Sequence, residues 1–236
     1  MSCQVKLIAH TTEPAKVVAA AARLCYSATP AGALFDGLDG ARTRDFLAKL
    51  LSVGHMSPFE HASFTFAIDG LSRVASHQLV RHRIASFSQQ SQRYVTMGEP
   101  RLVKPPSIAG DADAARAFDE ALREAYGAYE RLVEMGIPKE DARFVLPHGW
   151  ETSLVMTMNA RELHHFFALR LCRRAQWEIR GLARQMLASA LDVAPELFGH
   201  VGPGCATFGA CREYQPCGRP YADMQAILNE EEEEKI

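Results

Sequence analysis

Apolar side chains along the chain recur at two spacings, one typical of strands and the other typical of helices. Short apolar or alternating runs predict strands over residues 5–10 and 61–70. Because these strands come early and the predicted helices cluster after them, the pattern predicts an α+β fold. The helices are predicted over residues 13–27, 43–55, 112–135, 139–147 and 159–192, with another that begins at Leu71.

The longest predicted helix covers residues 159–192, with Asn159 as its expected N-cap and only Gly181 as a break. The helix that begins at Leu71 turns polar and arginine-rich, so we expect it to run into an extended loop. After Pro195 the chain is expected to be loop-like. The helix over residues 112–135 has one apolar side with an expected structural role, formed by Ala115, Phe118, Leu122, Tyr126, Tyr129 and Val133.

The composition is that of an ordinary globular protein, with 47% hydrophobic and 23% charged residues. The 236 residues fit one domain, which we place at 1–222, followed by an acidic tail at 223–236 that we expect to be disordered. With a net charge of −2, the protein as a whole has no positive electrostatic field that would attract nucleic acid or an anionic membrane. No apolar run is long enough to span a bilayer and no signal segment is recognisable, so we expect a cytoplasmic protein.

Six cysteines without a secretory signal predict reduced thiols. Three of them, Cys205, Cys211 and Cys217, are spaced C-x5-C-x5-C, whereas structural zinc sites favour tighter C-x2–4-C pairs with a fourth ligand. We therefore expect no metal site in this protein. Cys172 lacks a motif that would stabilise its thiolate, so core packing is its expected role.

No acidic residue stands between Asp69 and Glu99, although this stretch is rich in arginine and histidine. Guanidinium groups bind phosphate oxygens in pairs and remain charged, so the cluster is typical of a site for a nucleotide phosphate or pyrophosphate. Interleaved serines and glutamines add groups that can read a base edge. A solvated basic face or an RNA-contacting loop is the alternative. The cationic residues are Arg73, His77, Arg81, His82, Arg83 and Arg93.

The order of residues in this stretch resembles that of flavin-dependent thymidylate synthases. The signature of that family is Arg-His-Arg, seven residues and a serine, which matches Arg81-His82-Arg83 and Ser91. The resemblance implies a single domain with a central, mostly antiparallel sheet and clustered long helices. Three more segments are similar to the family in the expected order: His55-x-Ser-Pro-Phe-Glu-His61, Ala142-Arg143-x-Val-Leu-Pro147, and Asn159-Ala-Arg161 with Leu169-Arg170-x4-Ala-Gln176-Trp-Glu178.

By this resemblance the cofactor is FAD, and the three signature residues hold it together with His55 and Ser57 of a neighbouring subunit. The residues themselves agree, because a pyrophosphate can pair with arginines and the chain has no G-x-G-x-x-G turn to bind one otherwise. The implied FAD contacts are His55, Ser57, Arg81, His82, Arg83, Gln89, Asn159, Arg161 and His165.

The implied substrate is deoxyuridylate (dUMP), whose phosphate would pair with Arg93 and Arg143. The sequence departs from the commonest family pattern at three places. Gln89 stands where many relatives have glutamate, Ser88 where many have asparagine, and His77 where some have arginine. The implied dUMP contacts are Gln78, Arg81, Gln89, Gln90, Ser91, Arg93, Arg143 and Arg170.

Arg170 falls on an apolar stripe of the predicted long helix, with Phe166 and Trp177. An isolated buried charge is costly, so its guanidinium needs an anionic partner. In the family, the matching arginine stabilises the N3-ionised form of the uracil ring, which identifies Arg170 as the expected catalytic residue. A structural ion pair with Glu162 or Glu178 is the alternative. On another face the predicted helix aligns Arg161, His165, Cys172 and Gln176.

The reaction that the resemblance implies converts dUMP to dTMP. The one-carbon unit comes from 5,10-methylenetetrahydrofolate, and a flavin hydride that originates from NADPH reduces it. Active sites of the family lie between the subunits of a homotetramer, so a homotetramer is the expected assembly.

Two other classes of function are open on the sequence alone. One is a small RNA-binding module in which Phe87 and Tyr94 stack on bases. The other is a metal-dependent hydrolase, against which the adjacent histidines 164 and 165 speak because neighbours on a helix diverge. The candidate ligands of such a hydrolase are His55, His61, His164 and His165.

Overall fold

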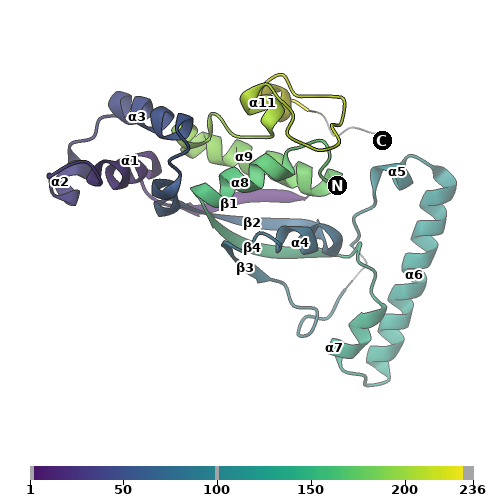
Figure 1. Cartoon of the computed structure of the whole chain (residues 1–236). Helices are drawn as coiled ribbons and strands as arrows, with labels where there is room; N and C mark the ends of the chain where they lie inside the picture. The colour runs from purple at the N-terminus through teal and green to yellow at the C-terminus, as the bar shows by residue number, and fades with distance from the viewer. Residues whose placement is uncertain (1–2, 99–100, 231–236) are drawn as a thin grey trace.

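A four-stranded antiparallel sheet forms the centre of the computed structural model, which describes residues 3–98 and 101–230 (Figure 1). The strand order is β1-β2-β4-β3, so the chain leaves the sheet after β3 and returns to its middle. The sheet and the helices around it confirm the expected α+β class with an antiparallel sheet. The strands are β1 Gln4–His10, β2 Ser63–Ser72, β3 Ala85–Gln89 and β4 Glu151–Asn159.

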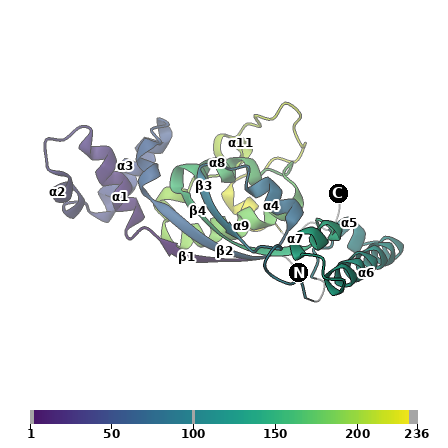
Figure 2. The ribbon, with the colours of Figure 1, turned by 90° about the horizontal axis from the view of Figure 1, so that it is seen from below.

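Within residues 3–98 and 101–230, helices cover only one face of the sheet. In β2 the buried side chains of Phe64, Phe66 and Ile68 alternate with half-buried ones, which produces the predicted period of two. Their partners on β4 are methionines and a leucine that are also buried. The opposite face is polar, with Thr65 and Thr157 hydrogen-bonded across the strands at 2.9 Å. Figure 2 shows this face without a helical layer over it.

Three helices lie over the buried face: α4 Arg73–Leu79, α8 Ala160–Arg170 and α9 Trp177–Val193 (Figure 1). Asn159 caps α8 as predicted, because its side chain accepts a hydrogen bond from the backbone N–H of Glu162 at 2.9 Å.

The single helix predicted over residues 159–192 is wrong, because the chain breaks between Leu171 and Gln176. The Gln176 side chain accepts hydrogen bonds from the backbone N–H groups of Glu178 at 3.1 Å and Ile179 at 3.0 Å. A glutamine thus caps α9, although glutamine is a good helix former and gives no breaking signal. Trp177 therefore does not continue the stripe of Arg170 on one helix.

The strand β4 was not predicted, although residues 151–159 alternate correctly. Thr152, Leu154, Met156 and Met158 are buried, and the residues between them are not. The segment after α4 was predicted as an extended loop, whereas part of it is strand β3, paired with β4. These two strands complete the sheet beside the arginine-rich signature.

Helices at the N-terminal end form a group to one side of the sheet in both views (Figures 1 and 2). Val18 and Ala22 of the first helix and Leu47 of the third are fully buried in the main core. The short helix α2 lies between the helices predicted over residues 13–27 and 43–55, where no helix was predicted. The group contains α1 Pro14–Leu24, α2 Ala31–Asp36, α3 Gly40–Ser52 and the 3-10 turn η1 Ser57–His61.

The segment between β3 and β4 builds an arm at the other end of the sheet (Figures 1 and 2). Its long helix starts and ends where predicted, but only Leu122 and Tyr129 of its apolar side are buried. The other four apolar residues are half-buried, so the arm has a small core of its own around Trp150. The arm consists of α5 Pro106–Ala109, α6 Ala112–Glu134, α7 Lys139–Ala142 and the 3-10 turn η2 Arg143–Val145.

The end of the chain packs on α9 instead of being disordered from residue 223. Glu230 lies 3.2 Å from Arg173, 3.5 Å from Arg180 and 3.2 Å from Arg184. Tyr221 donates a further hydrogen bond to this carboxylate at 2.6 Å. The expected disorder is therefore wrong for residues 224–230, and residues 231–236 lie outside the described ranges. The last helices are α10 Pro195–Phe198, α11 Gly204–Phe208 and α12 Met224–Leu228.

We expect Glu230→Gln to lower the free energy of unfolding by about 3 kcal/mol, because it leaves buried arginines without a compensating charge. The Glu230 side chain is only 4% exposed. Urea unfolding followed by circular dichroism measures the change at a fixed protein concentration. Glu130→Gln on the exposed side of α6 is the matched control and should change little. Equal stability of the two variants would contradict the packed chain end.

Candidate functional site

The centre of the site is the buried imidazole of His82, held between two charged side chains of α8. Its Nδ1 lies 3.0 Å from Oε1 of Glu162, and its Nε2 accepts a hydrogen bond from Nε of Arg170 at 3.0 Å. Glu162 stands in the first turn of α8 and Arg170 in the last. His82 follows α4, so this contact joins the signature segment to α8.

These hydrogen bonds determine the tautomer and the charge of the His82 imidazole. A guanidinium can only donate, so Nε2 is the acceptor and the ring proton sits on Nδ1, where it is donated to Glu162. Burial lowers the pKa of His82, the hydrogen bond to Glu162 raises it, and the charge of Arg170 lowers it again. The net pKa lies below 6.5 and the ring is neutral at pH 7. Phe166 packs edge-on against it, with ring centroids 5.0 Å apart.

Arg170 is half-buried and is oriented from two sides. Besides its bond to His82, its Nη2 donates to the backbone carbonyl of Gln78 at 3.4 Å. Burial lowers the pKa of Arg170, and the nearby charge of Arg81 lowers it further. Both effects disfavour the cation, and a bound anion would relieve them.

The structural alternative for Arg170, an ion pair with Glu162 or Glu178, is not formed. Among the residues that the structure describes, no carboxylate oxygen lies within 4.0 Å of its guanidinium nitrogens. Glu162 bonds to His82, and Glu178 accepts from the backbone N–H and hydroxyl of Ser72 at 2.6 and 2.5 Å. The positive charge of Arg170 is therefore not neutralised by a direct partner.

A pocket of about 610 Å³ opens over these groups. Arg81, His82 and Arg83 of the signature line it, together with Arg170 and His165. Arg81 and Arg83 are exposed, so three guanidinium groups face one concave surface. The predicted FAD contacts Arg81, His82, Arg83 and His165 are thus brought together with the predicted catalytic arginine.

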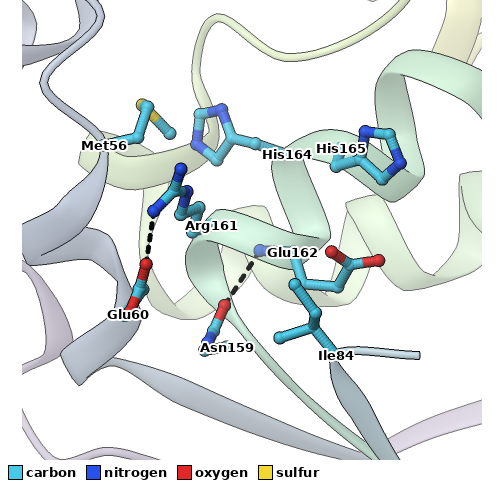
Figure 3. A pocket seen from close by; sticks show the side chains of 8 residues that line it. All are labelled: Met56, Glu60, Ile84, Asn159, Arg161, Glu162, His164 and His165. Carbon is cyan, nitrogen blue, oxygen red and sulfur yellow. Dashed lines mark hydrogen bonds and ion pairs between the residues drawn. The ribbon is translucent and has the colours of Figure 1, made fainter. Parts of the chain in front are cut away.

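A second pocket, of about 650 Å³, continues along α8 (Figure 3). Ile84, Glu162 and His165 line both pockets, so the two form one continuous strip. The second pocket adds the predicted FAD contacts Asn159 and Arg161. It also adds residues that are not among the predicted contacts of FAD or dUMP: Met56, Glu60, which pairs with Arg161, and His164.

The predicted phosphate ligands lie together, but at the beginning of α4 and not in this strip. Arg93 lies 2.5 Å from a carboxylate oxygen of Glu140, and Arg143 donates to the backbone carbonyl of Glu140 at 3.1 Å. Burial lowers the pKa of Arg73, and so does the charge of Arg143. The rings of His77 and His148 meet nearby, with centroids 5.3 Å apart. This second cationic cluster includes Arg73, a residue absent from the predicted contacts.

Several predicted contacts line neither pocket in this chain. The side chain of Gln89 donates to Thr152 at 3.2 Å on the sheet, and the Ser91 hydroxyl accepts from the backbone N–H of Arg93 at 3.2 Å. Gln90 lines a different pocket beside Trp150. His55 and Ser57 flank Met56 but do not themselves line the strip.

The hydrogen bond of Glu162 to His82 was not predicted from the sequence, which suggested Glu162 only as an ion partner of Arg170. One signal was available, since a carboxylate three residues after an asparagine N-cap is typical of a helix start. Its contact with His82 crosses 80 residues of sequence, and no local pattern predicts that.

A metal centre at this place fits poorly. The ligand atoms of His82, Glu162 and His165 lie within 4.8 Å of one another. Both ring nitrogens of His82 are already engaged, and the adjacent Arg170 cation would repel a metal ion. His164 bonds to the backbone carbonyl of Leu197 at 2.7 Å and points away from His165 (Figure 3). The geometry gives the hydrolase alternative no support.

Known proteins are similar to this chain in sequence and in fold. A family model described as "Thymidylate synthase complementing protein" matches residues 6–196. The chain belongs to this family. The chain is also similar to flavin-dependent thymidylate synthases from Geobacter sulfurreducens, 51% identical over 231 residues, and Clostridium tetani, 44% identical over 244 residues. Each alignment covers 96% of this chain, with 98% and 97% of the respective relatives.

A solved structure supports the same relationship. The UMP/dUMP methylase PolB from Streptomyces cacaoi, bound with 5-Br dUMP, matches with a TM-score of 0.73 at 30% identity. The match covers 84% of this chain and 94% of that chain. The resemblance inferred from the signature and its three companion segments is confirmed at the level of family and fold. The roles of individual residues stay predictions.

His164 makes the stability of this family member dependent on pH. Burial lowers its pKa from 6.5 to about 4, although the hydrogen bond to Leu197 opposes this. Below pH 6.5 the unfolded chain gains a proton that the folded chain refuses, so stability is lost as the pH falls from 6.5 towards 4. At pH 5 the expected loss from this group is about 2 kcal/mol relative to pH 7.

Urea unfolding at pH 7 and pH 5 measures this loss. His164→Gln keeps a donor for the Leu197 carbonyl but cannot titrate, so its loss of stability between the two pH values should be smaller by that amount. The exposed His200→Gln variant is the control and should follow the parent protein. A parallel decline in all three proteins would contradict the assignment.

Proposed function

We propose that this chain is a flavin-dependent thymidylate synthase, which methylates C5 of the uracil ring of dUMP and so produces dTMP. The observation that carries the proposal is Arg170, a half-buried cation oriented by His82 and the Gln78 carbonyl, with no direct carboxylate partner among residues 3–98 and 101–230. The family supports the reaction type, since its curated members are named for thymidylate synthesis with a flavin.

The residues along α8 fit FAD. Arg81 and Arg83 supply the cationic donors that a pyrophosphate requires, and the chain has no glycine-rich turn for that purpose. Asn159, Arg161 and His165 offer neutral and charged donors further along the same strip. When bound there, the flavin supplies the hydride that reduces the transferred carbon. By resemblance, NADPH reduces the flavin and 5,10-methylenetetrahydrofolate supplies the carbon.

Arg170 acts on the substrate through its charge. A cation beside the uracil stabilises the ring after loss of the N3 proton, and the added electron density makes C5 a better nucleophile. A carboxylate in direct contact would cancel this charge. Neutral His82 separates Glu162 from Arg170, so the guanidinium is oriented while its charge remains available to the substrate.

The cationic cluster at the beginning of α4 is proposed as the site of the dUMP phosphate. Arg93 and Arg143 stay its predicted ligands, with Gln78, Gln89, Gln90 and Ser91 for the rest of the nucleotide. His55, Ser57, Gln89 and Ser91 line neither pocket along α8, which supports a site completed by another subunit. We therefore propose a homotetramer with shared sites.

We expect Arg170→Ala to fold and retain flavin but to lose turnover by about 100- to 1000-fold, because a preorganised charge in the transition state is lost. Conversion of dUMP to dTMP at saturating substrate measures the change. Arg170→Lys keeps the charge but loses the fork that reaches His82, so only part of the loss should return. The exposed Arg44→Ala on α3 is the control, and near-parental turnover of Arg170→Ala would exclude the catalytic role.

We expect Arg143→Ala to raise the KM for dUMP by about 10- to 100-fold with a smaller effect on kcat, because phosphate contacts hold ground state and transition state alike. Steady-state kinetics with varied dUMP measures both constants. A fall in kcat with an unchanged KM would contradict the assignment of this cluster to the phosphate.

Mixed oligomers test whether the sites are shared. If His55 and Arg81 of one site come from different subunits, equal amounts of His55→Ala and Arg81→Ala chains should together regain about a quarter of the parental activity. Arg81 and Arg170 line one pocket of the same chain, so Arg81→Ala mixed with Arg170→Ala is the matched control and should regain none. Equal recovery in both mixtures, or in neither, would argue against the shared site.

The RNA-binding alternative has less support. Phe87 packs against the main core from β3, so its ring is not presented for stacking on a base. Tyr94 is exposed and lies beside Arg93, 5.3 Å from the guanidinium to the ring centroid. An absence of flavin absorbance in the purified protein, together with salt-dependent RNA binding, would favour this alternative.

The expected place in the cell stays a prediction. Within residues 3–98 and 101–230, the structure forms no helix with the length and apolar character needed to cross a membrane.

A further inference from the structure

Four of the six cysteines line one pocket of about 270 Å³, although Cys172 is far from the other three in the sequence. Cys172 lies in the turn between α8 and α9, Cys205 in α11, and Cys211 and Cys217 in the loop that follows. The proposed reaction uses none of them. The pocket lies outside the strip along α8 that contains Arg170.

Two of these sulfurs receive backbone hydrogen bonds of the same kind. The N–H of Arg219 donates to Sγ of Cys217 at 3.4 Å across Gly218, whose φ of 73° favours glycine. The backbone of Arg174 makes the equivalent hydrogen bond to the thiol of Cys172, again two residues further along. Donors aimed at sulfur orient it and favour the thiolate, which is the form that binds metal ions.

Close packing brings the backbones of Gly204 and Ala210 together. A Cβ on Gly204 would lie 2.9 Å from the carbonyl oxygen of Ala210, so this approach requires glycine. The N–H of Ala210 in turn bonds to the Gly204 carbonyl at 3.4 Å. Cys205 directly follows Gly204, and Cys211 directly follows Ala210. This backbone contact therefore keeps the two cysteines near each other.

The charges around the pocket match a bound cation with thiolate ligands. Glu213 lines the same pocket as the four cysteines and adds a negative charge there. Several negative groups in one pocket repel one another, so four thiolates there require a positive charge between them. Three arginines also line the pocket and would offset the two negative charges of a divalent ion with four thiolates.

We propose that Cys172, Cys205, Cys211 and Cys217 form a structural site for one zinc ion. Zinc prefers four sulfur ligands in a tetrahedron at about 2.3 Å from the metal. Apart from the His82 cluster, no three candidate ligand atoms of the described residues lie within 4.8 Å of one another. Binding therefore draws the exposed residues 211–217 inward. Each thiol releases its proton to solvent as it becomes a ligand.

The objection raised by the sequence is met by the fold. The spacing C-x5-C-x5-C is wide for a zinc site and leaves the fourth ligand unidentified. Cys172 supplies that ligand from a turn more than thirty residues earlier in the chain. Because Cys172 follows Arg170 by two residues, the zinc site would also secure the end of α8 that carries Arg170.

Metal content of the purified full-length protein tests the proposal independently of its activity. After desalting, mass spectrometry of the elements should find about one zinc per chain. Cys205→Ser and Cys217→Ser should each lose that zinc. Cys25→Ser removes an exposed thiol at the end of α1 and is the matched control, which should keep it. Iron in place of zinc, no metal, or equal zinc in all variants would overturn the proposal.

A second measurement covers variants that fold poorly. A strong zinc chelator should lower the melting temperature of the parent protein by about 5 °C, and added zinc should restore it. Cys217→Ser should not respond to either treatment, while bound flavin reports that it remains folded. A parent protein that is indifferent to the chelator would overturn the proposal, and so would a mass two units low that reveals a disulfide between these cysteines.

Discussion

The contact of neutral His82 with both Glu162 and Arg170 is the interaction on which the site depends. It joins the turn after α4 to both ends of α8, and so places Arg81, Arg83 and Arg170 around one pocket. The same imidazole keeps the carboxylate away from the guanidinium. A direct ion pair would stabilise the fold locally and remove the charge that the proposed chemistry needs, whereas a neutral intermediary orients Arg170 and preserves its charge.

The sheet explains why this contact can form. Large apolar side chains of β2 and β4 on its buried face pack against α8 and α9. One side of α8 therefore packs against the core, and another side lines the pockets of the candidate site. The helix presents Phe166 to the core and the longer polar side chains to the pockets. Among the described residues, the opposite sheet face carries threonines and has no helical layer, so this side and the arm are candidate surfaces for the subunit contacts of the proposed homotetramer.

Local signals predicted much of this arrangement. Alternation identified β2, Asn159 marked the start of α8, and the spacing of Arg81, His82, Arg83 and Ser91 identified the family. The predictions failed where a local side-chain cap overrides helix propensity, and where contacts between residues far apart in the sequence order the chain. The break before Gln176 depends on a side-chain cap in a stretch of good helix formers, and Glu230 is ordered because arginines of α9 surround its charge. His55 and Ser57 lie beside the strip and do not line it, and their predicted roles involve the site of a neighbouring subunit.

The ionisation state of bound dUMP tests the central role of Arg170 most directly. Nuclear magnetic resonance of dUMP labelled with nitrogen-15 at N3 reports whether that atom carries a proton. In the complex with the flavin-loaded protein at neutral pH, we expect N3 to be deprotonated, and in the complex with Arg170→Ala we expect it to be protonated. An N3 that stays protonated in the parent protein, or is ionised equally in both, would contradict the account.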